Sequence, residues 1–354
     1  MSAVIAPDGP DQGAIWHYGD PLGEQREALT GAVLVDRSNR ATLQLSGPDR
    51  QTWLHSISSQ HVAELPDSAV TENLSLDGQG RVEDHWLQTE LGGVSTLDTE
   101  PWRGEPLAEY LRKMVFWSKV EVTAADLAVL SLLGPGTDAV DLGAPTAAWT
   151  ASPVPGGFIR RVGAHALDLL VPQADRQAWM DRLAAAGVRP AGLWAYEALR
   201  AAALTPRLGV DTDERTIPHE VGWIGGPGEG AVHLDKGCYR GQETVARVHN
   251  LGRPPRMLAL LHLDGTADRP ATGDAVLAGG RAVGRVGTVA EHVDLGPIAL
   301  ALVKRGLPAD TELTAGGGAA AIDPDSVPAD DHVQAGRLAV DALRRSRSQT
   351  GGER

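Results

Sequence analysis

The pattern of apolar residues changes after Pro254-Pro255, and this change constrains the fold more than any other feature of the chain. From there on, short apolar segments alternate with glycine-containing turns, at residues 257–263, 275–277, 282–289 and 298–303. Evenly spaced short strands of this kind are typical of a small barrel. The sequence therefore predicts a C-terminal β-barrel over residues 251–322 and a flexible tail over residues 323–354.

Before that point the chain mixes strands and helices without regular alternation. Period-two alternation and short apolar runs predict strands at residues 32–35, 41–46, 70–76, 81–87, 119–122, 127–133 and 166–171. Apolar residues at helical spacing predict helices at residues 48–57, 104–116, 173–186 and 191–203. This mixture indicates the α+β class, with one domain over residues 25–125 and a second over residues 126–250.

A strand followed by a Gly-Pro turn occurs twice. Ser46-Gly47-Pro48 follows one such strand, and Gly134-Pro135-Gly136 follows another. In both places we expect a helix to come next, because proline is favoured in the first helical turn. The recurrence is a faint internal repeat and indicates two related α+β halves.

The charge balance and the cysteine count exclude several classes of protein. Lys+Arg 32 against Asp+Glu 46 gives a net charge of -14, so we expect neither a nucleic-acid footprint nor an anionic membrane surface as partner. The single cysteine, Cys238, cannot form a disulfide framework within one chain. No signal-peptide pattern begins the chain, and no apolar run approaches the roughly 20 residues that span a bilayer, so we expect a cytoplasmic protein.

Familiar catalytic and metal-binding motifs are missing from the sequence. It has no glycine-rich dinucleotide or P-loop motif and no Gly-x-Ser-x-Gly. The histidines do not have the spacing of metal ligands, so we expect no bound metal in the isolated chain.

The most informative segment is residues 236–247, which contains the cysteine. Cys238 lies two residues from Lys236 and two from Arg240, and helix-forming residues begin at Gln242. Cations and the amides of a helix N-terminus both favour a thiolate, so the sequence predicts a reactive cysteine. The alternative is a small buried apolar side chain that fills a turn.

The run Lys-Gly-Cys-Tyr-Arg-Gly-Gln-Glu at residues 236–243 resembles the signature of the YgfZ family. These are folate-binding-type proteins associated with the maturation or repair of iron–sulfur enzymes. The flanking residues 216–220 and 245–253 agree with that signature, and the wider resemblance runs from about residue 31 to 313. It extends to the aminomethyltransferase (T-protein) of the glycine cleavage system. The resemblance implies a ring of interleaved α+β domains around a central hole, with a small C-terminal barrel.

The resemblance also implies site residues, position by position. The stretch at residues 80–84, Gly-Arg-Val-Glu-Asp, is similar to the Gly-Gly-x-x-Asp-Asp of the aminomethyltransferases, whose acid lies beside the folate nitrogens. Asp84, with Glu83 beside it, is thereby implied as the catalytic and tetrahydrofolate-binding acid; the alternative is an exposed acid on a hairpin. Those enzymes hold the pterin with the glutamate of Arg-x-Glu-Ala-Gly, and Ala202 occupies that position here. Losing this acceptor implies weak folate binding.

The cysteine motif supplies the rest of the implied site. Cys238 and Lys236 are implied as catalytic, and Tyr239 and Arg240 as further cofactor-binding residues. We expect Lys236 and Arg240 to stabilise the thiolate. The full motif comprises Lys236, Gly237, Cys238, Tyr239, Gly241, Gln242 and Glu243.

Three functions remain open at this point. The resemblance implies an accessory protein for iron–sulfur enzymes that acts through Cys238 with iron–sulfur client or assembly proteins as partners. Because one cysteine cannot supply the four ligands that a cluster usually takes, any cluster contact is shared with a partner. The alternatives are a folate-dependent aminomethyl- or methyltransferase that uses Asp84, and a non-catalytic scaffold that binds a client. Whether the protein is an enzyme is therefore not decided by its sequence.

Overall fold

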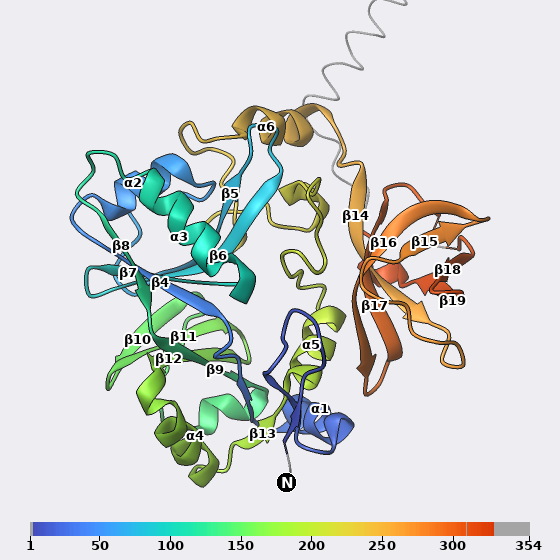
Figure 1. Cartoon of the computed structure of the whole chain (residues 1–354), viewed down its shortest axis with the longest axis horizontal. Coiled ribbons are helices and arrows are strands. Elements are labelled where there is room, and N and C mark those ends of the chain that lie inside the picture. Colours follow the sequence, from blue (N-terminus) through green and yellow to red (C-terminus); the bar gives the residue numbers. More distant parts are fainter. Residues whose placement is uncertain (1–2, 309, 329–354) are drawn as a thin grey trace, which may run out of the picture.

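The structure is a computed structural model that describes residues 3–308 and 310–328. An antiparallel sheet and a mixed sheet lie with their helices on one side of the molecule and a barrel on the other (Figure 1). The first sheet has the order β5-β6-β7-β4-β8. Its strands are β4 (Ala41–Ser46), β5 (Val70–Leu76), β6 (Val82–Leu91), β7 (Val94–Thr99) and β8 (Glu121–Ala125).

The second sheet has the order β10-β11-β12-β9-β3-β13. Its strands are β3 (Val33–Asp36), β9 (Leu127–Leu133), β10 (Thr150–Val154), β11 (Gly157–Gly163), β12 (Ala166–Pro172) and β13 (Arg189–Ala191). Strand β3 precedes the whole first sheet in the chain, yet it lies between β9 and β13 of the second sheet. This placement makes the two halves interleaved.

The barrel is closed, in the order β14-β17-β16-β15-β18-β19. Its strands are β14 (Arg256–Leu263), β15 (Ala275–Ala278), β16 (Arg281–His292), β17 (Gly296–Lys304), β18 (Leu313–Ala315) and β19 (Gly318–Ile322). Small and aliphatic side chains from all six strands fill its interior. The predicted α+β class with a small C-terminal barrel is confirmed.

Helices cover the sheets and connect them to the barrel (Figure 1). They are α1 (Pro21–Thr30), α2 (Arg50–Ile57), α3 (Gly104–Lys113), α4 (Arg176–Ala185), α5 (Leu193–Ala202) and α6 (Gln242–Leu251). Short 3-10 turns are η1 (Pro101–Arg103), η2 (Pro135–Ala139), η3 (Gln173–Asp175), η4 (Pro218–Glu220) and η5 (Pro324–Ser326). A small N-terminal sheet pairs β1 (Val4–Ile5) with β2 (Ile15–His17).

Two local predictions need correction. Helix α3 ends at Lys113 instead of continuing to residue 116, because Phe116 has a φ of 46, which a helix does not permit. The second Gly-Pro turn leads only into the 3-10 turn η2, not into an α-helix, so the repeat is partial. The predicted tail lies outside the described residues from residue 329 onward.

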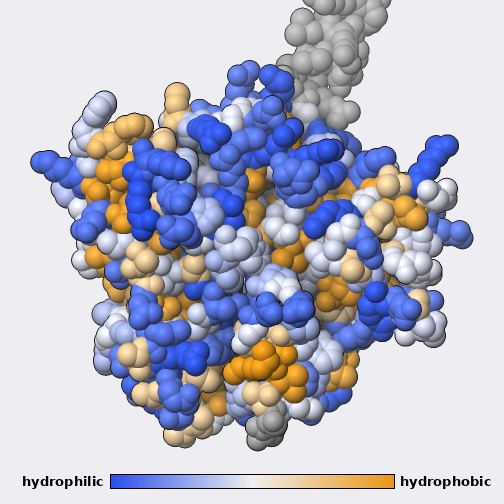
Figure 2. Space-filling view, viewed as in Figure 1, coloured by the Kyte–Doolittle hydropathy of each residue, from blue (hydrophilic) through white to orange (hydrophobic). Residues whose placement is uncertain are grey.

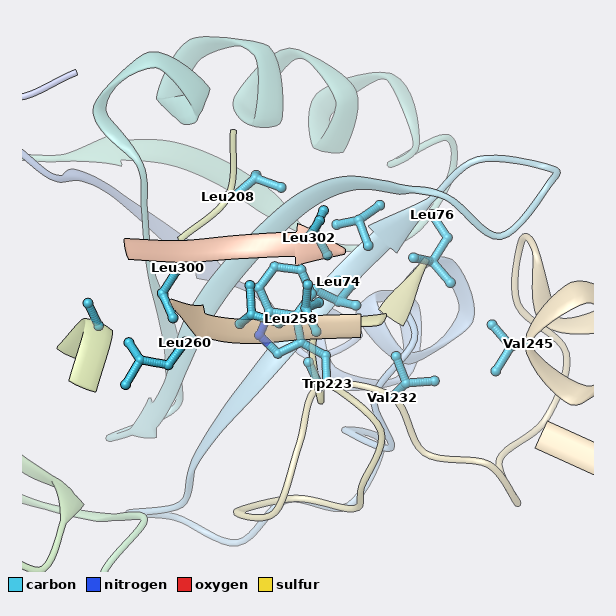
Figure 3. Close-up of a cluster of buried hydrophobic side chains, with 14 of the residues drawn as sticks. Leu74, Leu76, Leu208, Trp223, Val232, Val245, Leu258, Leu260, Leu300 and Leu302 are labelled. Atoms are coloured by element: carbon cyan, nitrogen blue, oxygen red, sulfur yellow. The ribbon is translucent and has the colours of Figure 1, made fainter. Parts of the chain in front are cut away.

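An apolar cluster joins the first sheet, α5 and the barrel. It includes Leu74 and Leu76 of strand β5, Trp223 of the long loop and Leu258 of strand β14 (Figure 3). Each of these side chains is at most 7% exposed, so the contact excludes water. Burial of apolar surface on this scale is the main favourable term in holding such parts together.

A network of buried ion pairs crosses the same region. Arg200 on α5 binds Glu197 one turn earlier and, at 2.8 Å, Asp211 of the following loop; it also donates to the hydroxyl of Thr288 in the barrel. Arg207 binds Glu197 as well. Its other partners are Asp11 of the N-terminal segment and Glu100 at the end of the first sheet. The network therefore ties four separate parts of the chain together.

Hydrophilic side chains cover most of the face seen in Figure 2, with hydrophobic residues in separate patches between them. Among the described helices, we find none with the length and apolar character needed to cross a membrane.

The ion-pair network predicts loss of stability in acid. Burial raises the pKa of Glu197, but the guanidinium groups of Arg200 and Arg207 outweigh it and lower the pKa to about 2. Because this lies below the ordinary value of 4.5, the stabilisation is present above pH 4.5 and is lost as pH falls towards 2, by about 3 kcal/mol in total. Urea unfolding between pH 7 and pH 3 would measure about 2 kcal/mol of this loss.

The matched variants are Glu197→Gln and Glu214→Gln. Glu197→Gln removes one titrating group and should make the acid limb shallower, while Asp98 and Asp213 still contribute to it because their pKa values are also lowered by arginine partners. Glu214→Gln changes an exposed acid and should leave the acid limb unchanged. An acid limb of equal slope in Glu197→Gln and the unaltered chain would show that the network is not its source.

Candidate functional site

Cys238 lies on a loop that we call the Cys238 loop, residues 234–241. The cysteine is exposed, as is Gly237 before it, and the loop leads directly into α6 at Gln242. The thiol is therefore open to a partner, and the alternative of a buried apolar filler is wrong for this position.

Lys236 anchors the loop to the end of helix α2. Its Nζ atom donates to the carbonyl oxygens of His55 at 2.5 Å, Ser58 at 2.6 Å and Gln60 at 3.1 Å. These carbonyls belong to the last turn of the helix and the residues just after it, where a cation complements the helix dipole. Burial lowers the pKa of Lys236 to about 7.

This geometry corrects the expected use of the two cations. The hydrogens of the Lys236 ammonium go to backbone carbonyls, so the lysine positions the loop instead of pairing with a thiolate. The Arg240 guanidinium is likewise engaged, with its Nη1 atom 2.9 Å from Oε2 of Glu83. Sequence spacing places both cations near Cys238 along the chain but does not determine where their side chains end.

The hairpin β5–β6 packs directly against the start of α6. Gly80 in the hairpin turn and Gly241 before the helix have φ values of 76 and 83, which favour glycine. A Cβ on Gly241 would lie 2.8 Å from the Cα of Gly80, and one on Gly80 would lie 2.9 Å from the Cβ of Thr244. The two stretches singled out in the sequence therefore meet in space, with no room for a side chain between them.

Tyr239 of the cysteine motif is buried. Its ring packs in the apolar cluster, where burial raises the pKa of the phenol to about 12. The Nζ atom of Lys236 lies 5.2 Å from the ring centroid, in a cation–π contact. Tyr239 thus joins the Cys238 loop to the apolar cluster.

A cleft of about 760 Å³ opens beside the hairpin, between it, η1, the long loop and the barrel. This volume suits a small-molecule ligand. We call it the cleft; its lining residues are Asp77, Arg81, Val82, Glu83, Asp84, Trp102, Arg103, Tyr110, Leu208, Gly209, Thr212, Asp213, Glu214 and Arg285.

Asp84 lines the cleft but is not an exposed hairpin acid, since only 2% of it is exposed. Its Oδ1 atom accepts from Arg103 Nε at 2.7 Å, and its Oδ2 atom accepts from the hydroxyl of Ser75 at 2.8 Å. Both carboxylate oxygens therefore have protein partners, so a ligand must compete with Arg103 for this acid.

Ala202 lies at the end of α5 and packs against the apolar cluster; it is not among the residues that line the cleft. The resemblance to the aminomethyltransferases implies two acids, one that holds the pterin and one that lies beside it. Here Asp84 is paired with Arg103 and Ala202 has no acidic group, so neither position offers a free acceptor. The residues of this cleft therefore do not fit the pterin in the manner of those enzymes.

Metal ligands are not gathered anywhere in the part of the chain that the structure describes: no group of three or more His, Cys, Asp or Glu side chains is placed to hold an ion.

Sequence reasoning missed several residues of the cleft. Arg103, which pairs with Asp84, carries no motif, and Arg285 lies on a barrel strand without any pattern of its own. Trp102 precedes Arg103 in the turn η1. Arg81 could have been found, because it stands inside the quoted stretch at residues 80–84.

Several known proteins are similar to this chain in sequence or in fold. No protein-family model matches the chain. It is 26% identical over 243 residues to the tRNA-modifying protein YgfZ of Vibrio atlanticus, covering 67% of this chain and 72% of that protein. It is 26% identical over 317 residues to the aminomethyltransferase of Herpetosiphon aurantiacus, covering 82% and 83%. The glycine cleavage system aminomethyltransferase T from Bartonella henselae matches its fold with a TM-score of 0.79 at 21% identity, covering 90% and 92%.

The structural match and the interleaved sheets with a terminal barrel define a protein of the aminomethyltransferase fold. Within that class, the chain is similar in sequence to YgfZ and to aminomethyltransferases. The resemblance inferred from residues 236–243 is thereby confirmed.

The anchor at Lys236 predicts a structural cost for its removal. Lys236→Met keeps most of the side-chain stem but leaves three carbonyls without their donor, which should cost about 1–3 kcal/mol of stability. Hydrogen exchange should become faster in the Cys238 loop. The control is Lys113→Met, whose side chain is 76% exposed and should change stability by less than about 0.5 kcal/mol. Unchanged exchange in the loop would refute the anchor.

Proposed function

We propose that this chain is a YgfZ-like accessory protein that supports the maturation or repair of iron–sulfur enzymes through Cys238. The observation that carries the proposal is the exposed thiol on a loop held at both ends. Lys236 fixes the loop to α2, and the Gly80–Gly241 contact fixes it to the hairpin. A thiol presented in this way is available to a partner while its own backbone stays in place.

A single thiol can supply only one ligand to an iron–sulfur cluster, so the partner must supply the others. A thiolate is a strong ligand for iron, but a cluster usually takes four protein ligands. Cys238 would thus contribute one ligand to a cluster that a client or assembly protein holds with the others. We place this exchange in the cytoplasm, where reducing conditions keep a single exposed cysteine free.

A folate-dependent aminomethyl- or methyltransferase is the second candidate. The similarity to aminomethyltransferases and the position of Asp84 in the cleft favour it. The ion pair between Asp84 and Arg103 and the alanine at position 202 count against it. We therefore assign tetrahydrofolate at most weak binding and derive no reaction step through it; a scaffold that only binds its client is the third candidate.

The three candidates predict different orders of variant effects. If the thiol carries the function, Cys238→Ala should be worst, Lys236→Ala intermediate and Asp84→Asn mildest, because the lysine acts on the thiol only through the loop. A transferase would reverse the ends of this order, and a scaffold would tolerate all three. The measurement is complementation of a strain that lacks YgfZ, with the activity of an iron–sulfur methylthiotransferase as readout, at matched levels of folded protein.

The free energy of unfolding of each variant is the control for this order of effects. Cys238 is exposed, so Cys238→Ala should lower the free energy of unfolding by about 1 kcal/mol at most. Full iron–sulfur enzyme activity with Cys238→Ala would refute the proposed mechanism.

Folate binding gives a separate prediction. Calorimetric titration with tetrahydrofolate should show binding weaker than micromolar, and Asp84→Asn should weaken it further because the variant lacks the carboxylate charge in the cleft. Glu64→Gln, at an exposed acid outside the cleft, is the control. Sub-micromolar binding that ignores Asp84→Asn would show that the folate site lies elsewhere.

A further inference from the structure

The turn between α3 and β8 holds two aromatic side chains in water. Phe116 is 71% exposed and Trp117 is 94% exposed, the two highest values for large apolar residues in the described part of the chain. Their ring centroids are 6.0 Å apart. The turn lies on the side of the molecule away from the barrel (Figure 1). Because aromatic residues supply much of the binding energy at protein interfaces, an exposed pair of them indicates a contact surface.

Hydrogen bonds to α2 and to its N-cap hold this turn in place on both sides of the aromatic pair. The indole Nε1 atom of Trp53 donates to the carbonyl oxygen of Met114 at 2.8 Å. After the pair, the amide of Lys119 donates to Oδ2 of Asp49, the N-cap of α2, at 2.8 Å. The rings are therefore presented on a fixed backbone, which lowers the entropy that a partner must remove on binding.

The backbone at Phe116 is strained where the chain leaves the core. Its φ of 46 lies in the left-handed region, which is disfavoured for a residue with a Cβ atom. Met114 and Val115, just before it, pack against the apolar core of the first sheet, whereas Phe116 and Trp117 do not. The strained residue thus separates core side chains from displayed ones, and strain of this kind is concentrated at functional positions.

Three exposed cations surround the aromatic pair: Arg112, Lys113 and Lys119. Arg112 and Lys113 form ion pairs with exposed glutamates of their own helix, at 3.2 and 3.8 Å. Such surface pairs are weak, so both cations can exchange to the carboxylates of a partner. Lys119 forms no ion pair with any described residue. We call these three cations and the two aromatic residues the Trp117 patch; its charge is complementary to an acidic surface.

The patch and the Cys238 loop are attached to opposite ends of one helix. Asp49 binds the turn at the N-terminal end of α2, and Lys236 binds the loop at the C-terminal end. Helix α2 has 8 residues, so its length is about 12 Å. A protein–protein interface of ordinary size covers about 800 Å² on each partner, so one partner can contact both the patch and the thiol.

We propose that the Trp117 patch is the docking surface for the protein client of Cys238, and that the client offers an apolar pocket for the indole with carboxylates around it. The identity of the client rests on the proposed function, whereas the docking rests on the geometry of the turn. A nucleic acid or an anionic membrane fits the patch less well, because the net charge of -14 and the glutamates of α3 repel phosphates.

Site-specific crosslinking in the strain that lacks YgfZ tests the kind of partner. The full chain carries the photoreactive substitution Trp117→p-benzoylphenylalanine, and irradiation should join it to an iron–sulfur client or assembly protein. The control is Leu295→p-benzoylphenylalanine, at a residue of the barrel that is 39% exposed, which should not capture that protein. Capture of RNA, lipid or a second copy of this chain, or no product at position 117, would overturn the proposal.

Calorimetry with the captured protein, purified, tests the residues of the patch on the full chain. Trp117→Ser should weaken binding at least tenfold, and Lys119→Glu should weaken binding and reduce its dependence on salt. Lys304→Glu, at an exposed lysine of the barrel, should bind as the unaltered chain does. Equal binding by Trp117→Ser and the unaltered chain would contradict the docking surface.

Complementation distinguishes the docking surface from the thiol function. Trp117→Ser should lose complementation while Cys238, the single cysteine, reacts with a thiol reagent at the rate of the unaltered chain. Full complementation by Trp117→Ser together with failure of Cys238→Ala would overturn the docking surface and keep the thiol function. The opposite result, full complementation by Cys238→Ala and failure of Trp117→Ser, would refute the thiol function and keep the docking surface.

Discussion

The structure depends on a single shared carboxylate, that of Glu197. Two arginines bind it: Arg200 on the same helix and Arg207 on the following loop. A buried charge that loses its partner is strongly destabilising, so these groups must all be in place together. Because their other partners are Asp11, Glu100, Asp211 and Thr288, the N-terminal segment, the first sheet, the long loop and the barrel have to assemble around α5 in one arrangement.

The positions of α5 and Arg207 also shape the wall of the cleft. Helix α5 turns its last residues into the apolar cluster, so Ala202 adds to the core and not to a ligand site. Arg207, fixed by the shared carboxylate, holds the ring of Trp102 in the cleft wall. The polar lining of the cleft comes from the hairpin, the loops and the barrel, and it includes five carboxylates as well as Arg81, Arg103 and Arg285.

The sequence allowed the hairpin, α5, α6 and four of the barrel strands to be predicted, because each carries clear apolar periodicity or a turn signal. Strands β18 and β19 were not predicted. The glycine and alanines of Gly318–Ile322 have no preference for strands, and they pair because the barrel closes there. The motif at residues 236–243 located the exposed thiol, but spacing alone could not show that Lys236 reaches across to α2. The pairing of Asp84 with Arg103 joins residues from separate elements, and only the folded chain brings them together.

The thiol and the cleft share one structural element, the turn of the β5–β6 hairpin. On one side Gly80 touches Gly241 at the start of α6, and Glu83 pairs with Arg240 next to the Cys238 loop. On the other side the turn carries Arg81 into the cleft. Since neither glycine leaves room for a Cβ, the contact cannot loosen by side-chain rearrangement, and a shift of the turn moves both sides at once. The two stretches recognised in the sequence, residues 80–84 and 236–243, therefore meet at this one turn, and a displacement of either one displaces the other.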